Sequence, residues 1–489
     1  MDSGPPNDIY ELHCGPHSCN NMDVLTGKPH IPPPKGPVPG VKTVNPPRCL
    51  TPLSVAPKLV PLPSPLPADL ARNGSFTATH SVSVHLLPAA FPRSASPVGP
   101  IQVPPMDSFA SKEEKAEWLK KGLAEILWID EESRKFHPDP RAGFTLPEIG
   151  LWSTVMRIKR NECAKDRKGV TIVATHPIGF HKEIWEPVFR HLIDITERPN
   201  SPIRIDEIWS LECIAHGDAA LINGRYLPKL PDRRDYGRDI ANLLINFLPE
   251  KAGQDVPQLL ERLPPSVAAR RAANGLPNRL VLGLGHSLGA DATVRCALEW
   301  PAIFGAIVVS ESTLFPASQS GSRAGPVVIK STLGRRSAWP SREEAKKGLL
   351  RSPMFAAWDP AAVDAYVRYG MYEDPATGQI RLKCPPGVEA CEFTRRQTMN
   401  EAFELMPTID ESLEIRWIMG AKEGASALVG GPEVAQAIIW RRPQNTTNIL
   451  IPGGGHLVVQ EQPKAVADDV AMFLRYKFAN EKQVDKARL

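Results

Sequence analysis

At 489 residues the chain is long enough for two or three domains. Apolar residues make up 42% and charged residues 23%, which is ordinary for a globular protein with a large core. The net charge of +4 is small for this length, so nucleic acid and anionic membranes are not expected as partners. No run reaches the ~18 apolar residues of a transmembrane helix. The eight cysteines are scattered, which is typical of a protein in a reducing compartment.

The N-terminal part of the chain has the composition of a proline-rich tail. Residues 1–105 hold 23 of the 51 prolines, and each proline fixes φ and removes a backbone donor. We therefore expect 1–105 to be disordered or extended. His13, Cys14, His17 and Cys19 lie close together, but the second pair of ligands that a zinc site needs is absent. No metal site is expected there.

A helix is predicted where the prolines end. Ser111-Lys112-Glu113-Glu114 forms a capping box, and apolar residues follow it at helical spacing up to Leu127. We assign 106–150 to a helical lead-in. Because this patterning begins near Met106, one hypothesis is that the mature protein starts at that methionine.

From about residue 150, short apolar strands alternate with helical stretches. Strands are predicted at 169–174, 203–215, 280–284, 305–309, 413–419 and 447–451, and helices at 185–192, 236–248, 288–300 and 463–478. Such alternation with continuous apolar strands predicts a mostly parallel, doubly wound α/β sheet. The sheet is divided between residues 151–312 and 409–489.

The segment between these two parts, 313–408, has a helical pattern. A capping box begins at Ser341, Asp359-Pro360 starts a second helix, and Gly370 ends it. A helical block inserted between two strands is expected to lie over one edge of the sheet as a lid.

The strongest chemical signal is Gly285-His286-Ser287-Leu288-Gly289, which follows a predicted strand and precedes a helix. A nucleophilic serine in this context sits on a sharp strand-to-helix turn, and glycines two residues away on either side relieve the crowding. Ser287 is therefore the predicted nucleophile.

A serine needs a base and an acid that orients it. The predicted base is His456, in a glycine-rich loop after the last strand. The favoured acid is Glu423, in the loop after strand 413–419, which gives the chain order serine, acid, histidine. Glu311, directly after strand 305–309, is the alternative acid.

Two backbone N–H groups are needed to bind the oxyanion of an acyl-transfer reaction. One is expected from Leu288, the residue after the nucleophile. The other is expected from the loop after strand 169–174, where Pro177 has no N–H and Ile178 is the predicted donor.

Together these residues resemble the α/β-hydrolase superfamily over about 150–480. His176 followed by Trp185 looks like the HG loop of that family, with Pro177 in place of its glycine. The segments THPIGFHKEIWEP, SAWPSREEAKKGLLRSPMFAAWDP and GGGHLVVQEQP resemble a narrower group, the fungal peroxisomal α/β-hydrolases. That group includes host-selective toxin biosynthesis proteins and a peroxisomal lipase.

The C-terminus, Ala487-Arg488-Leu489, has the small–basic–leucine pattern of a peroxisomal targeting signal. It implies a peroxisomal import receptor as a partner and a peroxisomal location, with the cytoplasm as the alternative.

These observations predict a serine hydrolase that cleaves a carboxylic ester or thioester through an acyl-enzyme. Its partner is a small acyl substrate, and neither an organic cofactor nor a metal is expected. Two alternatives stay open: a biosynthetic acyltransferase that uses the same triad, and a non-catalytic binding protein on a hydrolase scaffold.

Overall fold

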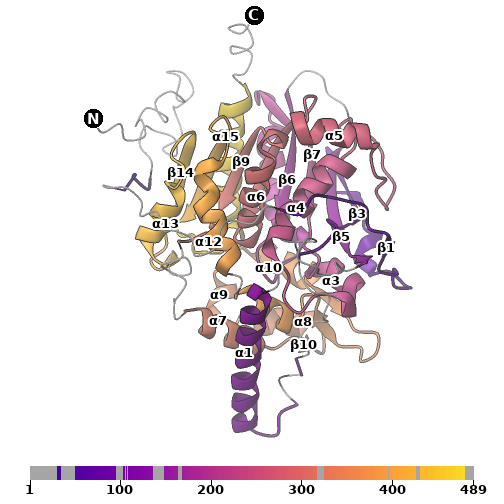
Figure 1. Cartoon of the computed structure of the whole chain (residues 1–489), viewed down its shortest axis with the longest axis vertical. Coiled ribbons are helices and arrows are strands. Elements are labelled where there is room, and N and C mark those ends of the chain that lie inside the picture. Colours follow the sequence, from indigo (N-terminus) through magenta and orange to yellow (C-terminus); the bar gives the residue numbers. More distant parts are fainter. Residues whose placement is uncertain are drawn as a thin grey trace, which may run out of the picture.

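The computed structural model describes residues 30–34, 50–94, 103–104, 106, 108–135, 148–162, 168–316, 324–394, 396–425 and 430–479. At its centre lies a nine-stranded sheet (Figure 1). In spatial order its strands are β14 (Thr446–Ile451), β13 (Glu414–Gly420), β9 (Ala306–Ser310), β8 (Leu280–His286), β6 (Lys168–Thr175), β7 (Ile203–Leu211), β5 (Trp152–Arg160), β3 (His80–Pro88) and β2 (Asn73–Ser75).

The six strands from β14 to β7 are parallel to one another. β5 pairs antiparallel with β7, and β3 and β2 continue the sheet in antiparallel pairing. The mostly parallel sheet is thus confirmed, and every strand and helix predicted from residue 169 onward is found within a few residues of its expected bounds.

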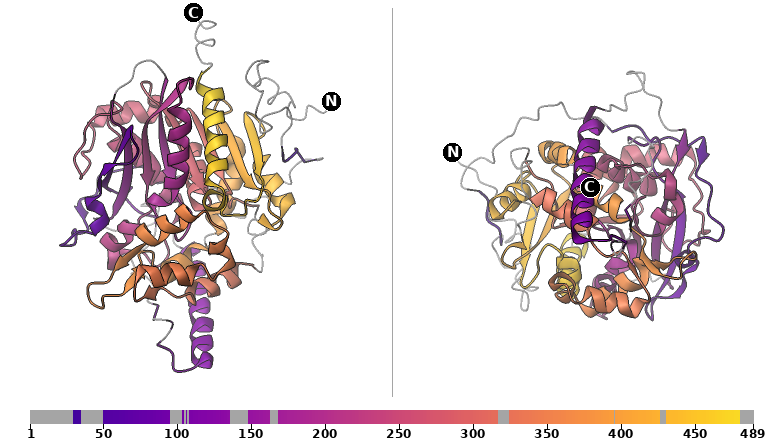
Figure 2. Two further views of the ribbon diagram at one scale, coloured as in Figure 1. Left: turned by 180° about the vertical axis from the view of Figure 1, so that it is seen from behind. Right: turned by 90° about the horizontal axis from the view of Figure 1, so that it is seen from below.

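Helices cover both faces of the sheet. One face carries α4 (Arg233–Asn242), α5 (Pro265–Asn274), α6 (Leu288–Glu299), α12 (Arg396–Leu405) and α13 (Pro432–Ile439), and the other carries α2 (Glu186–Thr196) and α15 (Pro463–Ala479) (Figures 1 and 2). Successive side chains of a strand point to opposite faces. Accordingly Ile172 and Val173, neighbours in β6, belong to two different apolar clusters. Burial on both faces explains why the strands are continuously apolar.

The predicted disorder of residues 1–105 is wrong for residues 50–94, the longest part of this segment that the structure describes. β3 pairs with β5 along its whole length, and Val82 and Val84 are buried. Residues 73–87 contain no proline and alternate polar with apolar side chains, but the proline content averaged over the whole segment concealed this strand. A chain that began at Met106 would lack β2 and β3.

The predicted helix after Met106 is α1 (Lys112–Lys135), and the Ser111 hydroxyl caps it by accepting a hydrogen bond of 3.1 Å from the Glu114 N–H. This helix does not lead into the sheet. It packs against two lid helices, α7 (Ala324–Leu333) and α11 (Pro386–Glu392), and extends beyond the body of the molecule (Figure 1). None of the described helices is long and apolar enough to cross a membrane.

The inserted lid contains α7, α8 (Arg342–Leu349), α9 (Pro353–Ala356), α10 (Pro360–Tyr369), α11 and a small sheet of β10 (Ala338–Trp339), β12 (Ile380–Leu382) and β11 (Met371–Glu373). Its predicted caps are present, because Ser341 accepts from the Glu344 N–H at 3.2 Å and Asp359 from the Ala361 N–H at 2.8 Å. α12 lies inside the predicted lid range 313–408 but packs against α6, so it covers the sheet with the other body helices.

A buried ionic cluster joins the lid to the body. The Lys182 ammonium lies 2.7 Å from Asp218 and 3.0 Å from Glu183, and the Lys383 ammonium of the lid lies 2.7 Å from Asp69 and also contacts Asp218. Its members are Asp69, Lys182, Glu183, Glu212, Asp218 and Lys383. The cluster therefore connects the N-terminal segment, the body and the lid. All of its members except the partly exposed Asp69 are buried, so water screens their charges poorly.

Glu212 gives this cluster a testable pH dependence. Burial raises the pKa of Glu212 to about 7. A raised carboxyl pKa favours the folded state only while the group is protonated. The contribution of Glu212 to the free energy of unfolding is therefore fully present below pH 4.5 and is lost as pH rises through about 7. Between pH 5 and pH 8, we expect the Glu212→Gln variant to gain up to about 3 kcal/mol in free energy of unfolding relative to wild type. Urea unfolding at both pH values measures this, with the exposed Glu433→Gln variant as reference. A pH-independent difference would contradict the assignment.

Candidate active site

Ser287 lies on a sharp turn between β8 and α6, at the carboxyl edge of the sheet. Its backbone has φ 52° and ψ −116°, a strained conformation for a residue other than glycine. The flanking glycines permit the close approach of the chain. A Cβ at Gly289 would lie 2.4 Å from the Thr175 carbonyl oxygen, and a Cβ at Gly285 would lie 2.6 Å from the Ala290 Cα. The turn thus has the sharp strand-to-helix geometry that the motif predicts for a nucleophilic serine.

Three side chains from three different loops form a hydrogen-bonded line. His456 Nε2 lies 3.2 Å from the Ser287 hydroxyl, and His456 Nδ1 lies 3.2 Å from the Glu311 carboxylate. Glu311 is fully buried and Ser287 is nearly so. The arrangement allows the imidazole to take a proton from the hydroxyl while the carboxylate holds the ring in one tautomer.

The preference for Glu423 as the acid is corrected by this geometry. Glu423 is exposed in the turn after β13, and no contact joins it to His456 among the described residues. Glu311, the alternative, occupies the position beside the imidazole because it follows β9, the strand between β8 and β13. Its backbone, with φ 47°, turns the side chain toward His456.

Backbone and side-chain contacts fix Glu311 in place. Its second carboxylate oxygen accepts from the Gly420 N–H at 2.7 Å, and its own N–H donates to the Ile418 carbonyl at 3.0 Å. The next residues are held by Asp291 of α6, which accepts from the Ser312 hydroxyl at 2.8 Å and the Thr313 N–H at 2.9 Å.

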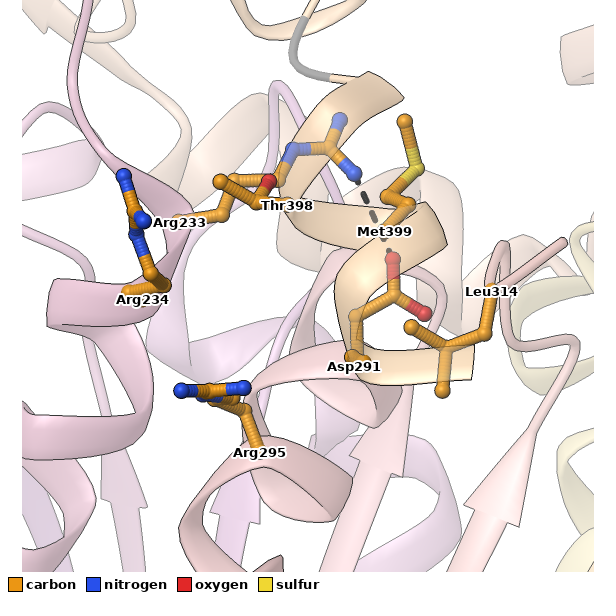
Figure 3. Close-up of a pocket in the computed structure, with 8 residues that line it drawn as sticks. Arg233, Arg234, Asp291, Arg295, Leu314, Thr398 and Met399 are labelled. Atoms are coloured by element: carbon orange, nitrogen blue, oxygen red, sulfur yellow. Dashed lines mark hydrogen bonds and ion pairs between the residues drawn. The ribbon is translucent and has the colours of Figure 1, made fainter. Parts of the chain in front are cut away.

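Asp291 in turn pairs with Arg233 at 3.3 Å, beside a small cavity between α4, α6 and α12 (Figure 3). The cavity measures about 10 Å³, room for about one water molecule. It therefore belongs to the contact between helices and is too small for an acyl group. Its lining also includes Arg234, Arg295, Leu314 and Met399.

His286, the variable residue before the nucleophile, has a positioning role that the sequence motif did not reveal. Its Nε2 lies 2.8 Å from the backbone carbonyl of His456 and donates to it. This bond holds the loop of His456 over the turn that carries Ser287. Burial lowers the pKa of His286 to about 3, which keeps this ring neutral. His286 stands between Gly285 and Ser287 at a position of the motif that any residue can fill, so the sequence did not indicate this role.

The loop that holds the predicted second oxyanion donor, Ile178, lies beside the turn that carries Ser287. Thr175 at the end of β6 is paired with Gly285 at the end of β8, so the residues after Thr175 reach the same edge as Ser287. Ile178 and Leu288 are both buried there. Their role as N–H donors to an oxyanion stays a prediction.

Neighbouring side chains hold this loop. His176 Nδ1 donates to the Pro177 carbonyl at 2.8 Å while its Nε2 accepts from the Cys213 N–H at 3.1 Å. Burial lowers the pKa of His176 to about 3, in agreement with a neutral ring that makes both bonds. Trp185 donates to the Thr175 carbonyl at 3.1 Å and fixes the end of the strand. The predicted targeting tripeptide Ala487-Arg488-Leu489 and the cluster His13–Cys19 lie outside the described residues.

Comparison with known proteins matches residues 172–469 to the model of the alpha/beta hydrolase family. Among curated proteins, the chain is 28% identical over 205 residues to the type I acyl-CoA thioesterase mpaH of Penicillium roqueforti, a match that covers 41% of this chain and 39% of that protein. It is 29% identical over 218 residues to the abhydrolase domain-containing protein AFT2-1 of Alternaria alternata, covering 39% of this chain and 81% of the relative. The matches thus span about two fifths of the thioesterase's length.

Among solved structures, the fold is similar to that of the peroxisomal alpha-beta-hydrolase Lpx1 of Saccharomyces cerevisiae. The TM-score is 0.57 at 14% sequence identity, with 82% of this chain and 90% of that chain covered. At this identity the similarity establishes the shared fold.

Proposed function

This chain belongs to the alpha/beta hydrolase family, and on that premise we propose that it is a serine hydrolase that cleaves a carboxylic ester or thioester through an acyl-enzyme. The observation that carries the proposal is the continuous hydrogen-bonded line from the Ser287 hydroxyl through His456 to the buried Glu311. A serine hydroxyl in contact with an oriented imidazole is an activated nucleophile.

In the proposed reaction, Ser287 Oγ attacks the acyl carbonyl and its proton passes to His456 Nε2. The Leu288 and Ile178 N–H groups bind the resulting oxyanion. The bond from the carbonyl carbon to the leaving oxygen or sulfur then breaks, and His456 gives its proton to the leaving group. Water, activated by the same imidazole, attacks the acyl-enzyme, and the second collapse releases the carboxylic acid and restores the Ser287 hydroxyl. Glu311 holds the imidazole and stabilises its protonated form throughout.

We favour an acyl thioester as the substrate. Support comes from the relatives described as acyl-CoA thioesterases, which the chain matches over about two fifths of their length. The peroxisomal location stays a prediction from the C-terminal tripeptide.

Labelling with a fluorophosphonate probe tests the proposal. Ser287 is expected to displace fluoride and form a stable bond to phosphorus, with the hydroxyl proton passing to His456. Wild type and the exposed-serine variant Ser412→Ala should be labelled equally, whereas Ser287→Ala should not be labelled and His456→Ala should react at least 10³-fold more slowly. Mass mapping of the modified peptide identifies the serine. Folded wild type that stayed unlabelled would refute the proposal and favour a binding protein on a hydrolase scaffold.

A further inference from the structure

Three lid elements converge on the loop that supplies the proposed oxyanion donor Ile178. The Phe180 ring of that loop stacks on Trp358 with ring centres 5.4 Å apart and meets the edge of Tyr366, in α10, at 5.6 Å. Because these rings are packed together, the conformation of the loop depends on the position of the lid.

The lid also lies close to the loop at Gly179, next to Ile178. A Cβ at Gly179 would lie 2.7 Å from the carboxyl carbon of Glu389 in α11, so the glycine lets a carboxylate rest directly on the loop backbone. Glu389 is buried, and burial raises the pKa of its carboxyl. A carboxylate at this place is unexpected beside a site that must bind negative charge.

Arg335, just after α7, compensates that charge. Its Nη1 donates to Glu389 Oε1 at 3.0 Å, and its Nη2 lies in ion-pair contact with the other carboxylate oxygen. A hydrogen bond between two charged groups is shorter and stronger than one between neutral groups, so it holds the carboxylate in place as well as compensating its charge.

We propose that Arg335 is a positioning residue for the oxyanion hole, which keeps the Glu389 carboxylate neutralised and fixed against Gly179. The inference rests on the proposed serine-hydrolase function. Without the guanidinium, an ionised Glu389 would repel the oxyanion that forms beside the neighbouring N–H group, because charges in a buried site are poorly screened. The charges of Glu389 and Arg335 cancel, so the pair has almost no net charge where it contacts the loop.

The inference has a distinctive pH signature. Removing Arg335 leaves the carboxyl of Glu389 without its counter-charge, so its pKa rises further. In the variant that lacks Arg335, Glu389 is then neutral at low pH and negatively charged at high pH. Its activity is therefore expected to fall at alkaline pH. Among the described residues, the other titratable groups that face the pair stay neutral, because burial raises the pKa of Tyr366 to about 12 and that of Cys384 as well, and lowers the pKa of His181 and of His216.

The test is the rate of fluorophosphonate labelling between pH 6 and pH 9.5, since the phosphoryl oxygen of this probe occupies the oxyanion position. Wild type is expected to rise to a plateau at alkaline pH, because the base that activates a serine acts in its unprotonated form. Arg335→Met should fall on the order of tenfold below that plateau at alkaline pH and approach wild type at acid pH. The double variant Arg335→Met/Glu389→Gln should regain the plateau, and Arg335→Lys, which keeps the charge, should follow the wild-type curve. Thermal unfolding of each variant at both ends of the range confirms that the protein labelled is folded.

The outcomes separate the two proposals. If wild type is labelled but Arg335→Met follows a curve parallel to it, or if the double variant stays as slow as the single one, Arg335 has no electrostatic role and the inference is wrong. If folded wild type is unlabelled at every pH, the proposed function itself fails and the inference fails with it.

Discussion

Replacing Glu311 by glutamine is expected to lower kcat on the order of 10⁴-fold, because an amide cannot stabilise the protonated His456 and favours the wrong tautomer of its ring. The substitution keeps the size of the side chain, so the backbone contacts of the loop should survive. The matched variant Glu423→Gln makes the same chemical change at an exposed position and should retain wild-type turnover. Steady-state hydrolysis of an activated ester and of an acyl-CoA thioester measures both.

This pair of variants decides between the two acids that follow neighbouring strands. The reverse result, with Glu423→Gln inactive and Glu311→Gln active, would require the turn after β13 to rearrange and carry Glu423 to the imidazole. Loss of activity in both would point to an effect on folding, which circular dichroism of the two variants detects.

The second large effect is on stability. Lys182→Met should lower the free energy of unfolding by about 3–5 kcal/mol, because it removes the ammonium that contacts the buried acidic side chains of Glu183 and Glu212 and leaves Asp218 with Lys383 alone. The matched change Lys464→Met removes a surface ion pair with Asp468 and should cost less than about 1 kcal/mol. Urea unfolding at pH 7 compares them. Equal effects of the two substitutions would mean that water reaches the cluster and screens it.

The same substitution also bears on the active site. Lys182 directly follows the loop His176–His181, and its carbonyl accepts from the Ser210 hydroxyl at 2.6 Å. Loosening of the cluster is therefore expected to loosen this loop as well, and the buried cluster links the stability of the lid to the position of the proposed oxyanion donor.

Local sequence determined the nucleophile turn and the sheet. Gly285, Ser287 and Gly289 follow a strand and precede a helix, and the close contacts of both glycines are made within the turn or with the adjacent strand. The continuous apolar strands and the alternation with helices determined the parallel sheet, because each such strand is buried on both faces. His456 could be identified because a loop after the last strand of this order reaches the edge where the nucleophile lies.

Tertiary structure alone decided the acid. Glu311 and Glu423 follow neighbouring parallel strands, and both therefore end at the same edge of the sheet. Which carboxylate meets the imidazole depends on the backbone turn at Glu311 and on the bond from the Gly420 N–H, and neither feature has a local signature in the sequence.

The same holds for the lid and the N-terminal strand. The caps at Ser341 and Asp359 predicted helices, because a cap acts within one turn of chain. The contacts of Glu389 with Gly179 and of Lys383 with Asp69 join residues that are hundreds of positions apart in the sequence. Local patterns therefore determined which elements form, and the long-range packing of buried charges and backbone turns decided which side chains meet.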